Sequence, residues 1–269
     1  MANPKATRPK AAPAAKPRST PAKAKKSARA RASAKAAPAA PAAGKRPTAE
    51  EARSVFAKLR AHHADAHCEL EHRSPFELIV ATVLSAQSTD VMVNQVTPEL
   101  FRRWPTPQKL ARALPEEVER TLGRLGFFRQ KTKSIVGLAQ KLIADHGGEV
   151  PRTLDELVKL PGVGRKTANV VLGVAFGAPE GVVVDTHVQR LTQRLGWTRH
   201  DEPIAIEQDL IRLFPRADWD AIGHVLIFHG RRICTARKPA CVGCPVEEAC
   251  PSAFHAENVG RKPVRARPR

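Results

Sequence analysis

The sequence predicts an all-α protein, and three observations support this fold class. Helix-start patterns recur along the chain, and apolar residues, for example within 55–59 and 78–83, follow the helical period. Alternation of apolar and polar residues at strand period is confined to a short stretch at 182–184. Prolines between positions 105 and 215 interrupt the pattern, which predicts about ten short helices joined by tight turns.

The helix starts have a recognisable chemistry. In a capping box, a hydroxyl side chain and a glutamate three positions later bond the free backbone N–H groups of the first helical turn. Three pairs have this spacing: Thr48 and Glu51, Ser74 and Glu77, and Thr153 and Glu156. We therefore expect helices to begin at each of these three places.

The N-terminal segment differs from the rest of the chain in composition. Residues 1–47 hold 13 Lys and Arg residues and no acidic residue, so they cannot bury enough apolar surface to offset the entropy of ordering. We expect a disordered basic tail here, and a second basic tail at 256–269. The remainder of the chain holds 32 basic and 26 acidic residues, so the tail supplies most of the net charge of +19. A polyanion is the expected partner, the alternative being that the tail only maintains solubility.

The apolar stretches around 78–86 and 170–178 are shorter than the roughly 20 residues that a membrane-spanning helix needs. No signal-peptide pattern precedes them. We therefore expect a protein without a membrane partner, located in the cytoplasm with the nucleoid.

A group of cysteines close to the C-terminus has the spacing C-x6-C-x2-C-x5-C. Such short loops can bring four thiolates to one point, which suits a tetrahedral metal ion or an iron–sulfur cluster. Disulfides are disfavoured in a chain without a secretion signal. Ligand type alone leaves zinc and iron open. The four residues are Cys234, Cys241, Cys244 and Cys250, whereas Cys68 lies apart and is expected to be an ordinary core or surface residue.

The stretch LPGVGRKTANVV at 160–171 resembles a phosphate-binding loop. A nucleotide-binding P-loop has glycine directly before its lysine and another glycine five residues earlier, but Arg165 and Leu160 occupy these places. Spacing therefore argues against an ATP site. A Pro-Gly-x-Gly turn between two helices remains, and we expect Gly162, Val163, Gly164 and Arg165 to present backbone N–H groups to a phosphate.

Several motifs in combination resemble the endonuclease III family of DNA repair glycosylases. They are LPGVGRKTA at 160–168, VDTHV at 184–188 and the cysteine spacing, supported by SPFELIVATVLSAQSTD at 74–90 and HGRRICTARKPAC at 229–241. The likeness covers about residues 50–252. It implies a [4Fe-4S] cluster on the four cysteines, damaged double-stranded DNA as partner, and a monomer.

The resemblance also implies two helical lobes with a DNA-binding cleft between them. A six-helix barrel with the helix-hairpin-helix would span residues 68–178. The iron–sulfur lobe would be discontinuous, made of 48–67 and 179–255. The linking segment 178–184 is slightly longer than is usual in the family, which we interpret as a surface insertion.

The implied activity is removal of oxidised pyrimidines from duplex DNA, with strand cleavage 3′ to the abasic site. Because a stacked base cannot be reached inside the duplex, the damaged nucleotide is first flipped out. Lys166 would attack the sugar carbon and form a Schiff base, from which the 3′ phosphate leaves by β-elimination. A lysine amine is mostly protonated at neutral pH, so Asp185 is expected to accept its proton and to offset positive charge on the sugar. The alternatives are a phosphate contact for Lys166 and a helix N-cap for Asp185, and capping is compatible with catalysis.

The resemblance assigns further residues to holding opened DNA. Gln87 matches the position whose side chain enters the gap left by the flipped base, the alternative being a polar residue that ends a core helix. Phe127 stands where relatives commonly carry a wedge, often leucine, so opposite-base preference stays open. The alternative is that Phe127 packs in the core and Phe128 faces outward. A monovalent cation can lie between the hairpin and the DNA, and Arg231, Arg232, Arg237 and Lys238 belong to a basic loop near the cysteines.

Three histidines on apolar helical faces, His187, His224 and His229, are expected to be structural. Two rival functions remain at this level. An adenine-excising relative would lack Lys166 and carry an additional C-terminal domain, and a non-catalytic helix-hairpin-helix module would bind DNA without cleaving it.

Overall fold

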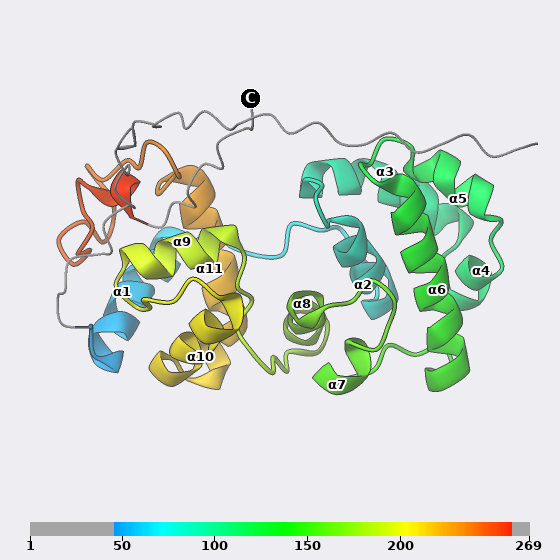
Figure 1. Cartoon of the computed structure of the whole chain (residues 1–269), viewed down its shortest axis with the longest axis horizontal. Coiled ribbons are helices and arrows are strands. Elements are labelled where there is room, and N and C mark those ends of the chain that lie inside the picture. Colours follow the sequence, from blue (N-terminus) through cyan, green and yellow to red (C-terminus); the bar gives the residue numbers. More distant parts are fainter. Residues whose placement is uncertain (1–45, 260–269) are drawn as a thin grey trace, which may run out of the picture. The chain divides into compact units, whose positions relative to one another are not determined.

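The structure is a computed structural model, and it describes residues 46–259. This part of the chain is helical and contains no strand, which confirms the predicted all-α class (Figure 1). The stretch at 182–184 is irregular rather than extended in a sheet.

The α-helices are α1 (Ala49–His62), α2 (Pro75–Leu84), α3 (Asp90–Arg103), α4 (Pro107–Ala111), α5 (Pro115–Leu122), α6 (Phe128–His146), α7 (Leu154–Leu157), α8 (Arg165–Phe176), α9 (Thr186–Arg194), α10 (Pro203–Leu213) and α11 (Trp219–Arg232). Two 3-10 helices, η1 (Arg216–Asp218) and η2 (Ala256–Asn258), complete the described elements.

Helices begin at all three predicted capping boxes, but only the first box is complete. Thr48 and Glu51 exchange both expected bonds at the start of α1. At α2 the hydroxyl of Ser74 accepts the expected bond, while the glutamate accepts from the N–H of Arg73 instead. The third box is wrong, because its two side chains bond each other and the first N–H of α7 donates to Glu180.

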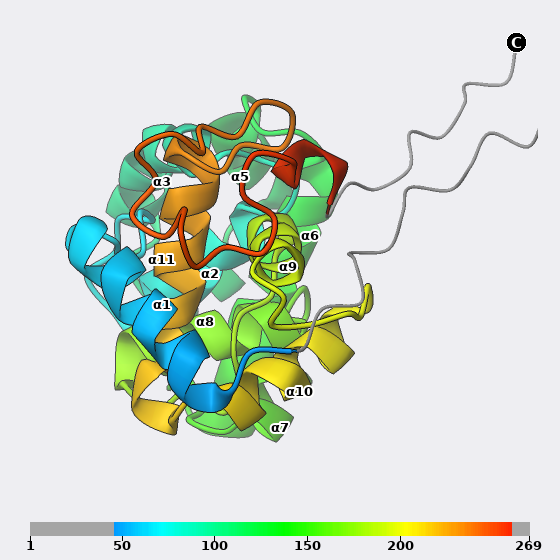
Figure 2. The same cartoon turned by 90° about the vertical axis from the view of Figure 1, so that its left-hand side faces the viewer.

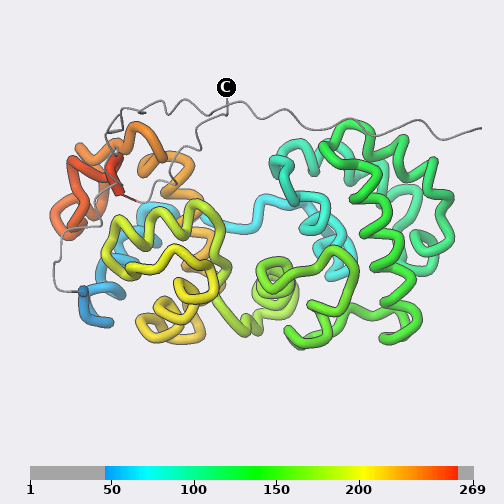
Figure 3. Tube along the Cα trace, in the orientation of Figure 1, coloured from blue at the N-terminus to red at the C-terminus, as the bar shows by residue number. Residues whose placement is uncertain are grey.

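Two hydrophobic clusters organise the described residues. The first cluster is formed by buried residues between Leu70 and Leu172, contributed by α2–α8 and their loops. The second cluster combines α1 with residues between Val182 and Val246, and so joins the beginning and the end of the described chain. The chain passes from the second cluster to the first after α1 and returns after α8, as the trace in Figure 3 shows. The boundaries at 67/68 and 178/179 stay predictions.

Contacts between helices hold each cluster together and also join the two clusters. In the second cluster α11 packs against both α1 and α9, an arrangement visible in Figure 2. In the first cluster α8 packs against α2 and α7, and it also contacts α11. The helix that begins at the glycine hairpin therefore lies against a helix of the second cluster.

The segment after α8 is not the surface insertion that its length suggested. Gly181, Val182 and Val183 are buried, and Val182 belongs to the second cluster. The carbonyl of Pro179 accepts a bond of 3.0 Å from Arg216. The segment is therefore packed structure, and length alone could not reveal this.

Most of the two predicted tails, 1–47 and 256–269, lies outside the described residues, namely 1–45 and 260–269. The described start of the second tail contains η2, and Ala256 and Val259 are buried there. Within the described residues, no helix is both long enough and apolar enough to cross a membrane.

Candidate active site

The predicted hairpin connects α7 to α8. Gly162 has φ +78°, which disfavours side chains, and a Cβ there would lie 3.0 Å from the Cβ of Ser134 and from a methyl of Val83. Gly164 has ordinary backbone angles and caps α8, with open space where a Cβ would point. Of the two hairpin glycines, Gly162 is therefore the one whose backbone angles and close packing require glycine.

The hairpin leaves fewer N–H donors than predicted. Val163 is buried and its N–H already donates to the carbonyl of Leu160 at 3.1 Å. The first turn of α8, where backbone N–H groups lack helical partners, is therefore the main source of donors for a phosphate.

Lys166 is the second residue of α8, directly after a tightly held arginine. The Arg165 guanidinium binds Glu207 of α10 through two bonds, of 2.8 and 3.1 Å. The Glu207 carboxylate is buried, and Asn169 donates to it at 3.2 Å. This bidentate pair ties the start of α8 to the second cluster, so the Arg165 side chain is an anchor and only its backbone remains for DNA.

Asp185 is the N-cap of α9, as the alternative for this residue predicted. Its Oδ1 atom accepts bonds of 2.8 Å from the N–H groups of both His187 and Val188. Both bonds go to the same oxygen. Capping orients the carboxylate and is compatible with a second role for the other oxygen.

Lys166 and Asp185 line one cavity, of about 120 Å³. Lys166 comes from a helix of the first cluster, whereas Asp185 starts a helix of the second cluster. Other walls are formed by Thr82 of α2, by Ser85 directly after α2 and by residues of α11. An amine and a carboxylate that are 19 positions apart in the sequence thus meet at one concave site.

Charged side chains of the same cavity bridge its walls. Arg231 of α11 binds Asp90 at 2.9 Å and also binds Glu69. His224 lies 3.6 Å from Asp220, one turn away on α11. The Arg231 guanidinium of the predicted basic loop is therefore engaged with two carboxylates, and the neighbouring Arg232 binds Asp65 at 2.8 Å.

Gln87 and Phe127 lie outside the lining of this cavity and are exposed. Both adopt left-handed backbone angles, φ 56° and φ 58°, which non-glycine residues rarely do. The Phe127 side chain is 68% exposed, whereas Phe128 packs against the first cluster. The alternative that placed Phe127 in the core is therefore wrong.

The four cysteines line a second cavity, together with apolar residues of α9 and the C-terminal loops. Within residues 46–259, no three His, Cys, Asp or Glu side chains are grouped closely enough to hold a metal ion. Arg194 is buried and donates to the sulfur of Cys234 at 3.1 Å. Burial raises the pKa of Cys250 to about 11, so this thiol stays protonated unless a metal replaces the proton. A set of four sulfurs beside a buried cation fits an anionic metal–thiolate centre.

The histidines are engaged in different contacts. His229 is buried between His63 and Cys244, at 3.0 and 3.6 Å, and burial lowers the pKa of His229 to about 4. Burial also lowers the pKa of His187, which bonds Arg190. His224 lines the candidate active site.

Sequence reasoning missed several cavity residues. Cys68 lies in the wall, and burial raises the pKa of its thiol. Asp220 also lies in the wall, packed so closely on Gly173 of α8 that a Cβ there would collide with it. No local sequence pattern marks either residue. Asp220, for example, reaches the cavity through the packing of α11 on α8.

Comparison with known proteins identifies the class. Residues 80–216 match the model of the HhH-GPD superfamily base excision DNA repair protein, a region that includes the hairpin, Lys166 and Asp185. Endonuclease III of Synechocystis is 48% identical over 211 residues, covering 78% of this chain and 95% of the relative. Endonuclease III of Bacillus subtilis is 50% identical over 186 residues, covering 69% and 84%.

Solved structures agree. A trapped covalent intermediate of endonuclease III with DNA matches with a TM-score of 0.72 and 45% identity, covering 76% of this chain and 96% of that chain. A non-covalent endonuclease III–DNA complex matches with the same TM-score and identity. The chain belongs to the endonuclease III family of base excision DNA repair proteins. It is accordingly a DNA glycosylase for oxidised pyrimidines, and an AP lyase mechanism is typical of the family.

Proposed function

We propose that Lys166 and Asp185 carry out base excision and strand cleavage in this protein. The supporting observation is that both side chains line one cavity although they come from different clusters. The flipped nucleotide would enter this cavity. The Lys166 amine attacks C1′ of its deoxyribose as the glycosidic bond breaks, and the bonding electrons leave with the base.

Asp185 supports this reaction in two ways. Its carboxylate accepts a proton from the attacking amine and offsets the positive charge that develops on the sugar. The amine adduct at C1′ then opens the sugar ring: the C1′–O4′ bond breaks, O4′ takes up a proton, and the nitrogen and C1′ form the Schiff base. This Schiff base acidifies the C2′ carbon, so loss of a C2′ proton expels the 3′ phosphate by β-elimination. Helix capping through Oδ1 fixes the carboxylate, and Oδ2 is the oxygen that we assign to the reaction.

Damaged double-stranded DNA is the proposed substrate and partner. The first turn of α8 and the hairpin would bind a phosphate, with a monovalent cation between them and the DNA. Gln87 would fill the gap left by the flipped base, and Phe127 would separate the stacked bases. Their exposure and left-handed backbones support this assignment, since backbone strain is common at functional sites. A monomer associated with the nucleoid is part of the same proposal.

A [4Fe-4S] cluster is the group that the family carries, and we propose Cys234, Cys241, Cys244 and Cys250 as its ligands. Four sulfurs around one cavity and the buried cation of Arg194 support this assignment. When bound, the cluster would stabilise the loops of residues 233–253. Visible absorbance with matching iron and sulfide content in the purified protein would test the assignment, and loss of both in Cys241→Ser should accompany it.

The Lys166→Gln variant tests the catalytic assignment. Gln cannot form an imine, so we expect borohydride trapping on thymine glycol DNA and strand nicking to be abolished, while DNA binding persists. Asp185→Asn is a companion variant, because asparagine caps helices about as well as aspartate. Trapping that persists in Lys166→Gln would refute the nucleophile. Binding without any excision by the unaltered protein would instead favour the non-catalytic module.

A further inference from the structure

Lys131 of α6 is a buried lysine that the proposed mechanism does not use. Its side chain is only 5% exposed, and its ammonium nitrogen donates to the hydroxyl of Ser88 at 2.7 Å. Burial lowers the pKa of Lys131 below its ordinary value. A buried cation that is satisfied by a neutral hydroxyl costs free energy, so packing alone does not account for a lysine here.

The contacts of Lys131 connect two separate segments. Its backbone N–H donates to the carbonyl of Phe127 at 3.0 Å, in the first turn of α6. Its side chain crosses to Ser88, the residue that follows Gln87. The bond to Phe127 is an ordinary helix bond that any residue at position 131 would make, so the lysine side chain adds the link from the start of α6 to the residue next to Gln87.

The two connected positions are both strained. Gln87 and Phe127 are two of the three non-glycine residues with positive φ among residues 46–259. Such backbones cost on the order of 1–3 kcal/mol and persist only where surrounding contacts hold them. Ser88 lies in a short turn between α2 and α3, and the bond from Lys131 holds this turn against α6.

The same helix also positions the hairpin. Ser134, three residues after Lys131, packs on Gly162, and a Cβ on Gly137 would lie 3.5 Å from the Cγ of Pro161. The three segments that would contact DNA are thus all placed relative to α6. The side-chain bond of Lys131 is the polar link between α6 and the Gln87 loop.

We infer that Lys131 is a positioning residue that fixes the Gln87 loop relative to Phe127, so that both side chains enter opened DNA in one preset geometry. The inference rests on the proposed roles of Gln87 and Phe127. Loss of the link would leave the catalytic cavity intact but would slow extrusion of the damaged nucleotide.

Two variants remove the link in different ways. Lys131→Met keeps most of the buried volume and deletes the cation, while Ser88→Ala deletes only the accepting hydroxyl. The matched control is Lys141→Met, which removes a lysine charge from the same helix about 15 Å away, where the lysine pairs with Asp145 at the surface.

Single-turnover excision of thymine glycol from duplex DNA measures the effect. We expect both variants to be slowed about 10- to 100-fold, the range that small misplacements produce, and the double variant to be slowed no further. Borohydride trapping on an abasic site in single-stranded DNA should be unchanged, because no base pair must be opened there. Lys131→Met should be at least as resistant to urea as the unaltered protein, and Lys141→Met should excise normally.

The outcomes separate this inference from the proposed function. Duplex excision at the normal rate in both variants would overturn the positioning role, as would equal slowing on duplex and single-stranded substrates. If Lys131→Met does not fold, Ser88→Ala decides by the same two rates. Failure of the unaltered protein to trap any substrate would refute the proposed function itself.

Discussion

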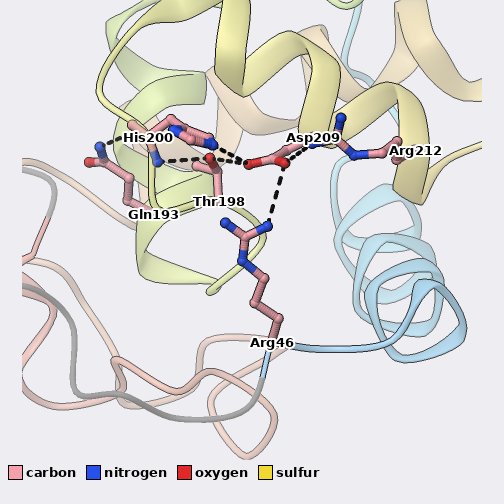
Figure 4. Close-up of polar contacts among 6 residues, drawn as sticks. All are labelled: Arg46, Gln193, Thr198, His200, Asp209 and Arg212. Atoms are coloured by element: carbon pink, nitrogen blue, oxygen red, sulfur yellow. Dashed lines mark hydrogen bonds and ion pairs between the residues drawn. The ribbon is translucent and has the colours of Figure 1, made fainter.

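Two aspartates of the second cluster, Asp185 and Asp209, show how similar side chains acquire different roles. Asp209 of α10 is 3% exposed and is surrounded by partners: Thr198 donates to it at 2.7 Å, Arg212 binds it, and Arg46 and His200 lie at 3.5 and 3.8 Å (Figure 4). Asp185 instead uses one oxygen for backbone N–H groups and lines a cavity with Lys166.

The two carboxylates differ in how fully neighbouring groups balance their charge and in whether a substrate can reach them. Both oxygens of Asp209 are bonded, Oδ2 by Thr198 and Oδ1 by Arg212, so a substrate finds no free acceptor there. The Asp209 carboxylate thus links α10 with the Thr198 segment and with Arg46, which lies three residues before α1. Both cap bonds of Asp185 use Oδ1, and the residue lines the cavity, where a developing positive charge would meet its carboxylate. The buried carboxylate of Asp209 is thus structural because its charge is balanced, whereas the partly buried carboxylate of Asp185 has the access that its proposed role requires.

The largest effect is expected at Asp185. Asp185→Asn should lower the excision rate about 10²- to 10⁴-fold, the usual contribution of a positioned acid or base. Stability should change by less than about 1 kcal/mol, because asparagine retains an oxygen for the N-cap bonds. Single-turnover rates and urea unfolding measure the two quantities, and a large loss of stability with normal activity would reverse the comparison.

Asp209→Asn should have the opposite profile. Removing the charge weakens bonds to Arg212 and Thr198, and bonds to charged groups contribute about 1.5–3 kcal/mol each. We expect the free energy of unfolding to fall by about 2 kcal/mol, with normal excision per folded molecule. An excision defect at unchanged stability would contradict the structural role.

The same variant predicts a difference in pH dependence. Although burial raises the pKa of Asp209, the bonds from Thr198 and Arg212 outweigh it and hold the pKa below the ordinary value of 3.8. The Asp209 contribution to stability is therefore fully present above about pH 4 and is lost as pH falls through the depressed pKa. The stability difference between the unaltered protein and Asp209→Asn should shrink below pH 4 in urea titrations.

The smallest effect is expected at the rim of the Asp209 group. Arg46 is 45% exposed and lies 3.5 Å from Asp209, and exposed ion pairs contribute about 0–1 kcal/mol. Arg46→Ala should therefore change the urea midpoint little, and less still at high salt. A loss comparable to that of Asp209→Asn would show that Arg46, rather than Arg212, balances the buried charge.

Much of the helical framework could be predicted because its causes are local. The box at Thr48 and Glu51 needs residues within one turn, and the same holds for the cap that Asp185 forms on α9. The box at Thr153 failed because its two side chains, of Thr153 and Glu156, bond each other instead of the backbone. The likeness of motifs identified Lys166 and the four cysteines as candidates, but it could not place Val182 and Val183, whose burial depends on the second cluster.

The sequence by itself determined the helical class, the glycine hairpin and the four-cysteine ligand set, because spacing along the chain encodes turns, caps and ligand sets. The choice of Lys166 and Asp185 as reactive candidates came from the likeness of motifs to one family. Only the tertiary structure decided which side chains meet. It joined Lys166 to Asp185 in one cavity and exposed Phe127 while packing Phe128 against the first cluster. It also bound Arg165 to Glu207 and brought Lys131 to Ser88. These contacts arise from the packing of helices that are far apart in the chain, and local residue patterns do not predict such packing.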